Sequence, residues 1–129
     1  MINSDSELNP LIAELQELGV KHDPEAIVCI AKQADGKIVF LEIGDRSRGL
    51  QHILEKAEQF ANIGINVEEI PDAIMTALTQ GAIIGYQGKK HRHPRPIYEF
   101  SFNDETKYIS ITVASNGYIV GANPRTQPN

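Results

Sequence analysis

The segment 95–124 constrains the fold more than any other part of this sequence. Polar and apolar residues alternate along 95–102 and 107–113, a period typical of half-buried β-strands. Residues 103–106, Asn-Asp-Glu-Thr, predict the turn between them. Ser115-Asn116-Gly117 predicts a second turn, because Asn-Gly tolerates the positive φ that a two-residue hairpin turn needs. We therefore expect three antiparallel strands joined by two tight turns.

The same alternation gives the expected sheet two unlike faces. One face is apolar and predicted to be buried; it carries Tyr98, Phe100, Phe102, Ile109, Ile111 and Val113. The opposite face carries Arg95, Glu99, Ser101, Tyr108, Ser110 and Thr112. A sheet face lined by hydroxyls, one guanidinium and one carboxylate is unusually polar, which indicates a binding site for an anion.

The first half of the chain predicts a helix followed by a hairpin. Asn9-Pro10 is a helix-start signal, with Asn as N-cap and Pro in the first turn, and Gly19 can end that helix. Two strand candidates, 26–32 and 37–43, flank the turn residues Ala34-Asp35-Gly36. The polar residues 44–47 are expected to form a loop.

Two further helices are predicted before the sheet. Apolar residues recur at helical spacing over 48–63, and 68–80 has Pro71 in its first turn and Gly81 as terminator. A short strand at 82–86 follows. The expected fold class is α+β: an N-terminal helix and hairpin, two helices, then a four-stranded antiparallel meander. We expect one domain over 1–129, with 1–25 as a helical extension and 26–124 as the core.

Composition narrows the class of protein. A chain of 129 residues with 41% hydrophobic content can bury the core of one domain. It contains no apolar run of the roughly 20 residues that span a membrane, and residues 1–10 lack a signal-peptide pattern. The single cysteine, Cys29, lies in an apolar run and is interpreted as a core residue.

Charge is unevenly distributed along the chain. The net charge is −5, yet residues 81–129 hold 6 Lys and Arg against 3 Asp and Glu. Most of this excess lies in one basic loop, 89–95, which contains Lys89 and Lys90. Such a loop can dock a phosphate backbone or an acidic partner, or it can be a solvated loop without a partner. His91 and His93 in the same loop are too weak a signal for a metal site, so we expect no metal and no cofactor.

One histidine has a setting that suits proton transfer. On a helix over 48–63, Arg48, His52 and Lys56 align at i, i+4 and i+8 along the flank of the apolar stripe. His52 would then stand between two cations at the edge of the buried face. The alternative is an exposed helix histidine without a role.

Several sequence blocks together resemble a toxin family. The blocks are GLQHILEK (49–56), FANIGI (60–65), IGYQG (84–88), RPIYE (95–99), ITV (111–113) and NGYIVGANP (116–124). In this order they resemble the C-terminal toxin domains of filamentous-haemagglutinin-type contact-dependent inhibition proteins. Those domains are similar to the barnase–EndoU–colicin–RelE group of metal-independent ribonucleases. The resemblance extends over about 26–124, and the closing block is its most specific part.

The resemblance implies roles for particular residues. His52 would be the general acid or base, while Lys56 and Arg95 would stabilise phosphate charge. Thr112 and Tyr98 match family positions that can hydrogen-bond phosphate or ribose. Ser110, on the predicted polar face with Thr112, is a further candidate for substrate binding. Strand alternation points Tyr98 toward the core, however, and therefore favours Thr112. Independently of the resemblance, their positive charge makes Arg48, Lys89 and Lys90 candidates for substrate binding. Asn116 and Asn123 also match the closing block, although both are more simply interpreted as turn formers.

One departure from the family pattern affects the expected activity. The family helix carries a second histidine, whereas here Lys56 is followed directly by Ala57 and the helix is one residue shorter. A one-residue deletion turns everything beyond it by about 100°. Lys56, charged at neutral pH, can act only as an acid or an electrostatic stabiliser. Reduced cleavage is therefore expected.

Three classes of function remain open from the sequence. The first is a small RNA-cleaving toxin domain that acts on transfer RNA and is neutralised by an acidic immunity protein. The second is a catalytically degenerate relative that binds RNA or a protein through the same face. The third is an unrelated acidic interaction domain. As it stands the chain is expected to be cytoplasmic, or secreted if it is part of a larger toxin.

Overall fold

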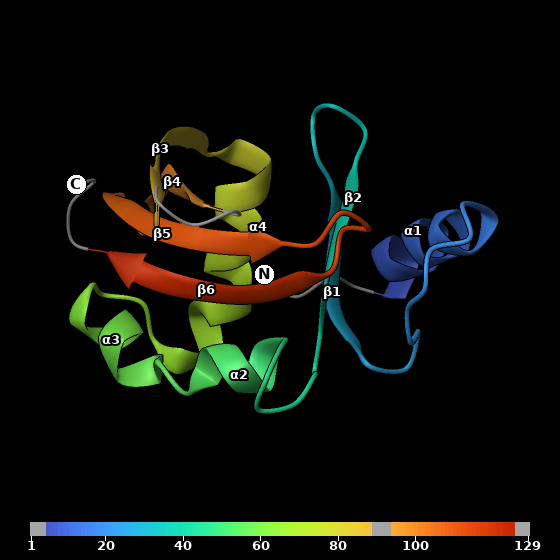
Figure 1. Cartoon of the computed structure of the whole chain (residues 1–129), viewed down its shortest axis with the longest axis horizontal. Coiled ribbons are helices and arrows are strands. Elements are labelled where there is room, and N and C mark those ends of the chain that lie inside the picture. The colour runs from blue at the N-terminus through green and yellow to red at the C-terminus, as the bar shows by residue number, and fades with distance from the viewer. Residues whose placement is uncertain (1–4, 89–93, 126–129) are drawn as a thin grey trace.

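The computed structural model of the protein describes residues 5–88 and 94–125 and has an α+β fold (Figure 1). Its helices are α1 (Asp5–Glu17), α2 (Leu50–Leu54), α3 (Ala57–Asn62) and α4 (Ile70–Gln80), with a 3₁₀ turn η1 (Val67–Glu69) leading into α4. Its strands are β1 (Ile27–Lys32), β2 (Ile38–Glu42), β3 (Ala82–Gln87), β4 (Arg95–Phe102), β5 (Glu105–Val113) and β6 (Ile119–Arg125). No helix within the described ranges is long and apolar enough to cross a membrane.

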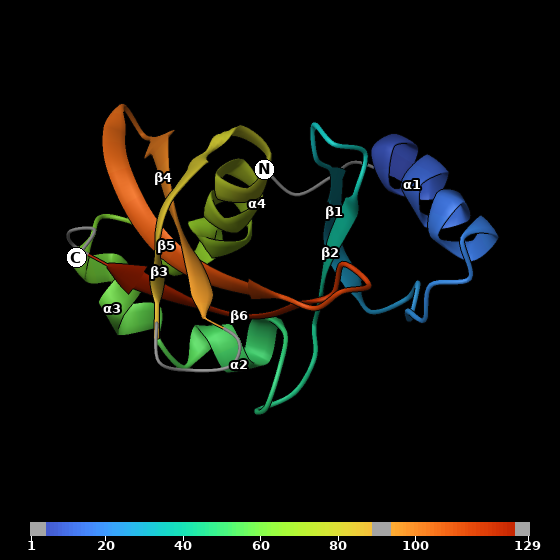
Figure 2. The ribbon, with the colours of Figure 1, turned by 45° about the horizontal axis from the view of Figure 1, so that its top comes forward.

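The four-stranded sheet is the meander that the sequence predicts. Its strands are antiparallel in the order β3-β4-β5-β6. The predicted apolar face is confirmed, since Tyr98, Phe100, Ile109 and Ile111 are buried, and Phe102 packs at the rim. Helix α4 lies against this face (Figure 2), where Ile74 and Ala77 are fully buried.

The two turns of the meander differ in length from the prediction. The first contains only Asn103 and Asp104, which both have positive φ (54° and 63°), the geometry of a tight hairpin turn. The second is a five-residue loop, 114–118, because Gly117 leaves the meander to meet β2. The carbonyl of Gly117 accepts a hydrogen bond from the N–H of Phe40, and a Cβ on Gly117 would stand 2.1 Å from the Ile38 oxygen. Only glycine permits this approach.

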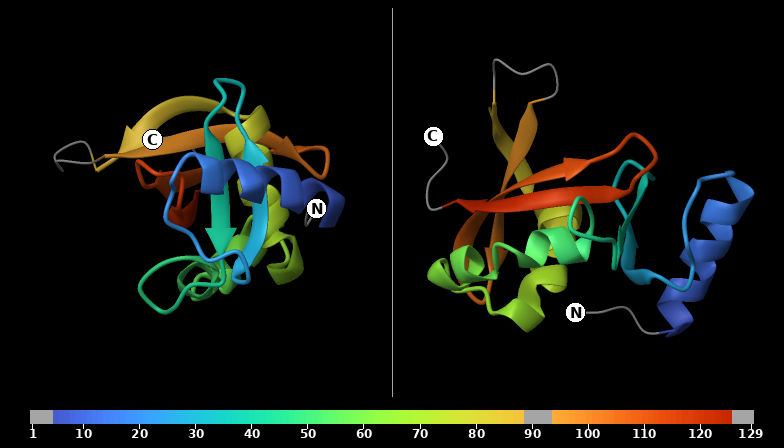
Figure 3. Two further views of the ribbon diagram at one scale, coloured as in Figure 1. Left: turned by 90° about the vertical axis from the view of Figure 1, so that its right-hand side faces the viewer. Right: turned by 60° about the horizontal axis from the view of Figure 1, so that its bottom comes forward.

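The β1–β2 hairpin is a second, separate sheet that is covered on both faces. Cys29, Val39 and Leu41 face the large core under the meander, whereas Ile30 and Phe40 face a smaller cluster under α1. In the left panel of Figure 3, α1 crosses the two strands on their outer side. A continuous apolar run along both strands is typical of a hairpin buried on both sides.

Helix α1 begins earlier than the sequence signal indicates. It starts at Asp5, so the prediction that Asn9 caps it is wrong and Pro10 lies inside the helix. An internal proline removes one backbone hydrogen bond, and the helix tolerates this because Leu15 is 1% exposed against the hairpin. The predicted end is confirmed: Gly19 has φ +70°, and its N–H bonds the Gln16 carbonyl.

The predicted continuous helix over 48–63 is wrong. The chain forms two short helices, α2 and α3, separated by Glu55 and Lys56. The N–H of Glu55 bonds the His52 carbonyl and that of Lys56 bonds the Ile53 carbonyl, so the last turn of α2 tightens and ends there. Arg48 lies outside α2 altogether, because its neighbour Gly49 has φ +84° and is the N-cap. The second predicted helix is confirmed as η1 and α4, which Asn66 and Glu69 begin with a capping box.

Candidate active site

A cleft of about 270 Å³ brings together four side chains from three separate segments. Its lining comes from α2, the α2–α3 junction and strands β4, β5 and β6: His52, Lys56, Arg95, Thr112, Val120, Gly121, Ala122 and Asn123. The first four are the residues that the resemblance assigns to catalysis. The right panel of Figure 3 shows how α2 runs along β6, which places the helix side chains beside the sheet.

The register of the sheet explains how Arg95 and Thr112 meet. Ile97 with Ser110 is the last pair between β4 and β5, and Arg95 and Thr112 each lie two residues beyond it, toward the same end of the sheet. Thr112 in turn pairs with Gly121 of β6. Arg95, Thr112 and Gly121, from three neighbouring strands, all line the cleft.

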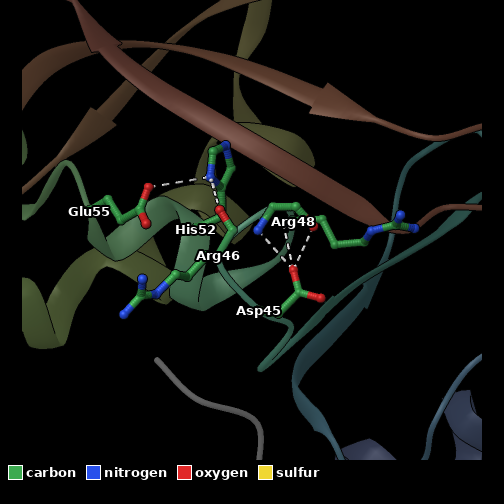
Figure 4. A network of polar contacts seen from close by, with 6 residues as sticks. Asp45, Arg46, Arg48, His52 and Glu55 are labelled. Carbon is green, nitrogen blue, oxygen red and sulfur yellow. Dashed lines mark hydrogen bonds and ion pairs between the residues drawn. The ribbon is translucent and has the colours of Figure 1, made fainter.

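His52 lines the cleft from helix α2, beside Gly121 of β6. Its ring atoms Cδ2 and Nε2 lie 3.5 and 3.7 Å from the point where a Cβ on Gly121 would stand. Its Nδ1 lies 2.8 Å from the carbonyl oxygen of Arg46 and 3.6 Å from a carboxylate oxygen of Glu55 (Figure 4). The nearest partners of His52 are thus a carbonyl and a carboxylate, and the predicted placement between two cations is wrong.

The Arg46 contact orients the imidazole. A carbonyl oxygen can only accept a hydrogen bond, so Nδ1 must carry the proton that it donates. In the neutral ring, Nε2 then holds the free lone pair and faces β6. This is the tautomer that a general base needs on the side of the cleft.

The loop 44–49 fixes the position of the Arg46 carbonyl. One oxygen of Asp45 accepts hydrogen bonds from the backbone N–H groups of Ser47 and Arg48 and from the Ser47 hydroxyl, at 2.7 to 3.2 Å. These bonds hold the pKa of the Asp45 carboxyl below its usual value. The N–H of Gly49 bonds the carbonyl of Val120, which ties the end of the loop to β6. The loop is therefore built onto the strand that His52 faces.

Lys56 and Arg95 give the cleft its positive charge. Neither forms an ion pair within the described parts of the chain. Burial, and then the charge of Arg95, lower the pKa of Lys56, while Glu55 opposes them. Arg95 is thus the second cause of this lowered pKa, after burial, and an anion bound between the two cations would be attracted by both.

Other predicted site residues lie elsewhere. Tyr98 is 8% exposed on the core side of the sheet, as strand alternation predicts, and burial raises the pKa of its phenol. Ser110 is fully buried, so its expected place on an open polar face is wrong: its hydroxyl donates a hydrogen bond to Oε1 of Gln87, at the end of β3, at 2.8 Å. Arg48 and Asn116 line a second cavity beside the cleft. Lys89, Lys90 and most of the basic loop lie outside the described residues.

The closing sequence block, 116–124, supplies residues 120–123 to the wall of the cleft, although its two asparagines were interpreted as turn formers. Asn116 is a turn former as interpreted, since its side-chain oxygen accepts the N–H of Tyr118. Asn123 is not; it lies inside β6 and lines the cleft. Sequence reasoning missed Gly121 and the Arg46 carbonyl. The glycine in an otherwise strand-like run is the signal for Gly121, because it marks a close approach of another element.

The comparisons with known proteins do not identify this chain. No protein-family model matches it, and no curated protein matches it in sequence. Within residues 5–88 and 94–125, no group of three His, Cys, Asp or Glu side chains could hold a metal ion.

Proposed function

We propose that the His52 cleft binds the phosphate backbone of RNA and cleaves it without a metal ion. The observation that carries this proposal is the meeting of one oriented imidazole, two unpaired cations and a hydroxyl in one cleft. These groups are 60 residues apart between His52 and Thr112, so a local sequence pattern alone does not bring them together. The same four positions match the toxin family that the sequence resembles.

The geometry suits transesterification at phosphorus. Nε2 of His52 takes the proton of the ribose 2′-hydroxyl, and the 2′-oxygen attacks phosphorus to form a 2′,3′-cyclic phosphate. The bond from phosphorus to the 5′-oxygen breaks, and that oxygen accepts a proton from the ammonium of Lys56. Arg95 and Thr112 stabilise the charge that develops on the phosphoryl oxygens. The lowered pKa of Lys56 makes it a better proton donor than an ordinary lysine.

A test uses purified protein and total transfer RNA in excess EDTA, with detection of 2′,3′-cyclic phosphate ends. His52→Ala and Lys56→Gln should each slow cleavage by about 10²- to 10⁴-fold, the contribution typical of one proton-transfer group. Gln51→Ala is the matched control, because Gln51 is exposed on the same helix outside the cleft. Cleavage that persists unchanged in His52→Ala would refute the proposal.

The second candidate is an RNA-binding module of the same fold that has lost catalysis. It is favoured by the break between α2 and α3, which falls at Glu55–Lys56, where the sequence lacks the family's second histidine. A variant with histidine inserted after Lys56 separates the two candidates. Cleavage by the natural sequence supports the enzyme; RNA binding without cleavage, and cleavage only after the insertion, support the binding module. Transfer RNA as substrate and an acidic immunity protein as partner are proposed on the resemblance alone.

A further inference from the structure

A second and larger cavity, of about 470 Å³, adjoins the His52 cleft. Val120 lines both, so they are neighbours along β6. The walls come from the segment before β1, the end of β2 and the loops 44–49 and 114–118, and they include His22, Glu42, Arg48, Asn116 and Tyr118. Figure 4 shows the side chain of Arg48 extending away from His52. Arg48 therefore lines the larger cavity and His52 the cleft.

The aromatic wall of this cavity is held rigidly. The Tyr118 ring meets the ring of Phe40 edge to face, with centroids 5.7 Å apart and planes at 88°. The backbone N–H of Tyr118 donates a hydrogen bond to the side-chain oxygen of Asn116. The Tyr118 hydroxyl lies close to Gly49, since a Cβ added to Gly49 would stand only 3.0 Å from it. Burial, followed by the charge of Glu42, raises the pKa of the phenol. A fixed aromatic ring in a cavity is the usual stacking surface for a nucleobase.

The polar wall offers both kinds of hydrogen-bonding group. Glu42 accepts the N–H of Asp23 through one carboxylate oxygen at 2.9 Å, and its other oxygen has no partner within the described residues. The guanidinium of Arg48 forms no ion pair within those residues. His22 belongs to the same wall, and its Nε2 is buried there without a hydrogen-bond partner among them. A ligand in this cavity must therefore present donors to a carboxylate and acceptors to a guanidinium.

Guanine is the nucleobase whose edges match this wall best. It carries the donors N1–H and N2–H₂ on one edge and the acceptors O6 and N7 on the next, and arginine pairs with O6 and N7 in two hydrogen bonds. Adenine, cytosine and uracil each lack one of these sets. The spacing also fits a nucleotide: Tyr118 lines one cavity and Gly121 the other, and three residues of chain span at most about 11 Å.

We propose that the cavity lined by Tyr118, Glu42 and Arg48 binds the guanine of a nucleotide whose phosphate lies in the His52 cleft. The RNA context of this site rests on the proposed function, whereas the guanine pocket itself does not. The carboxylate of Glu42 accepts from the N1 and N2 edge, Arg48 donates to O6 and N7, and Tyr118 stacks on the ring. RNA cleavage, where it occurs, is then directed next to guanosine.

The test titrates the full chain separately with guanosine, adenosine, cytidine, uridine and inorganic phosphate, and follows backbone amide signals by NMR. Guanosine should shift the signals of Tyr118 and Asn116, whereas phosphate should shift those of Gly121 and Thr112. Glu42→Gln should weaken guanosine binding by roughly 5- to 150-fold, the discrimination of one well-made base contact, and leave phosphate binding unchanged. Glu58→Gln, an exposed position on α3, is the control.

The outcomes separate this inference from the proposed function. Guanosine that binds no more tightly than the other nucleosides, or binds equally to Glu42→Gln, overturns the guanine pocket even if RNA is cleaved. Guanosine that binds selectively to a protein that neither binds nor cleaves RNA upholds the pocket and removes the proposed function. Arg48→Gln is a second test of the guanine pocket, and it should also weaken guanosine binding. Unshifted amide signals of α4 would show that this variant retains the fold.

Discussion

The two faces of the β1–β2 hairpin pack against hydrophobic clusters of very different size. The large core joins the meander, α2, α3 and α4, and its fully buried side chains include Ile53, Phe60 and Ile74. Among the residues whose burial is described, the cluster under α1 has four buried members: Leu15, Ile30, Ile38 and Phe40. Half-buried residues surround it, among them Tyr118 from the loop 114–118. The comparison indicates that the meander side carries the stability of the fold, while the α1 side shapes the wall of the second cavity.

The largest effect is expected from a deletion in the large core. Phe60→Ala should lower the free energy of unfolding by about 3–5 kcal/mol, because Phe60 is fully buried and little around it can collapse into the space. Chemical denaturation followed by circular dichroism measures this change. A loss below about 1 kcal/mol would mean that the two sides do not differ as described.

A deletion in the small cluster should act more locally. Leu15→Ala should cost about 2–3 kcal/mol, near the low end for such changes, because half-buried neighbours can close around the gap. Hydrogen exchange should show faster opening of α1 while the amides of β4 and β5 remain protected. Equal acceleration in the sheet would show that α1 and the meander unfold as one unit.

A buried lysine, Lys107, also distinguishes the two sides of the hairpin. Among the described residues, a buried charged side chain occurs only at the rim of the large core. The ammonium of Lys107, 7% exposed, donates to the carbonyl of Ile63 at the end of α3 and to Glu105. Lys107→Met should cost about 1–3 kcal/mol, since the Ile63 carbonyl loses its partner. Lys37→Met, at an exposed turn, is the control and should be near neutral.

The smallest effect is a pH dependence that reports on the core side of the hairpin. Burial raises the pKa of the Cys29 thiol from 9.0 to about 12. Between these values the unfolded chain loses the proton and the folded chain keeps it, so stability falls as pH rises above about 9, by at most about 1.4 kcal/mol per unit. Cys29→Val should remove this component of the slope between pH 8 and 10. An unchanged slope would place the effect elsewhere.

The same thiol distinguishes local from global opening. Cys29 faces the large core and not α1, so its rate of labelling by a thiol reagent should stay unchanged in Leu15→Ala and rise in Phe60→Ala. Labelling that rises equally in both variants would contradict the separation of the two sides.

Features that depend on local sequence were predictable, and features that depend on distant contacts were not. Alternation placed Tyr98 and Ile109 on the buried face, and Gly19 and Gly81 marked helix ends, because each signal acts within a few residues. The burial of Ser110 depends on Gln87, 23 residues away. Arg48 and His52 do not share a helix face, because Arg48 belongs to the loop 44–49. Helical periodicity in the sequence cannot predict the conformation of that loop.

The candidate site shows the same division. His52, Lys56, Arg95 and Thr112 were selected from their chemistry and from the resemblance, and they do line one cleft. The tautomer of His52 was not predictable, since it depends on a backbone carbonyl. The cavity beside Tyr118 was also missed, because its walls come from segments that are far apart in the sequence and share no motif.

The two-sided burial of the β1–β2 hairpin has a consequence for synthesis on the ribosome. The hairpin is complete once residue 42 has emerged, yet α4 and the loop 114–118, which cover its inner face and hold Phe40, are made much later. During that interval a pair of strands with an uncovered apolar face is exposed to other nascent chains. Slow translation between residues 42 and 118 should therefore favour aggregation, and a chaperone that binds extended apolar segments should engage this chain before its last strand is made.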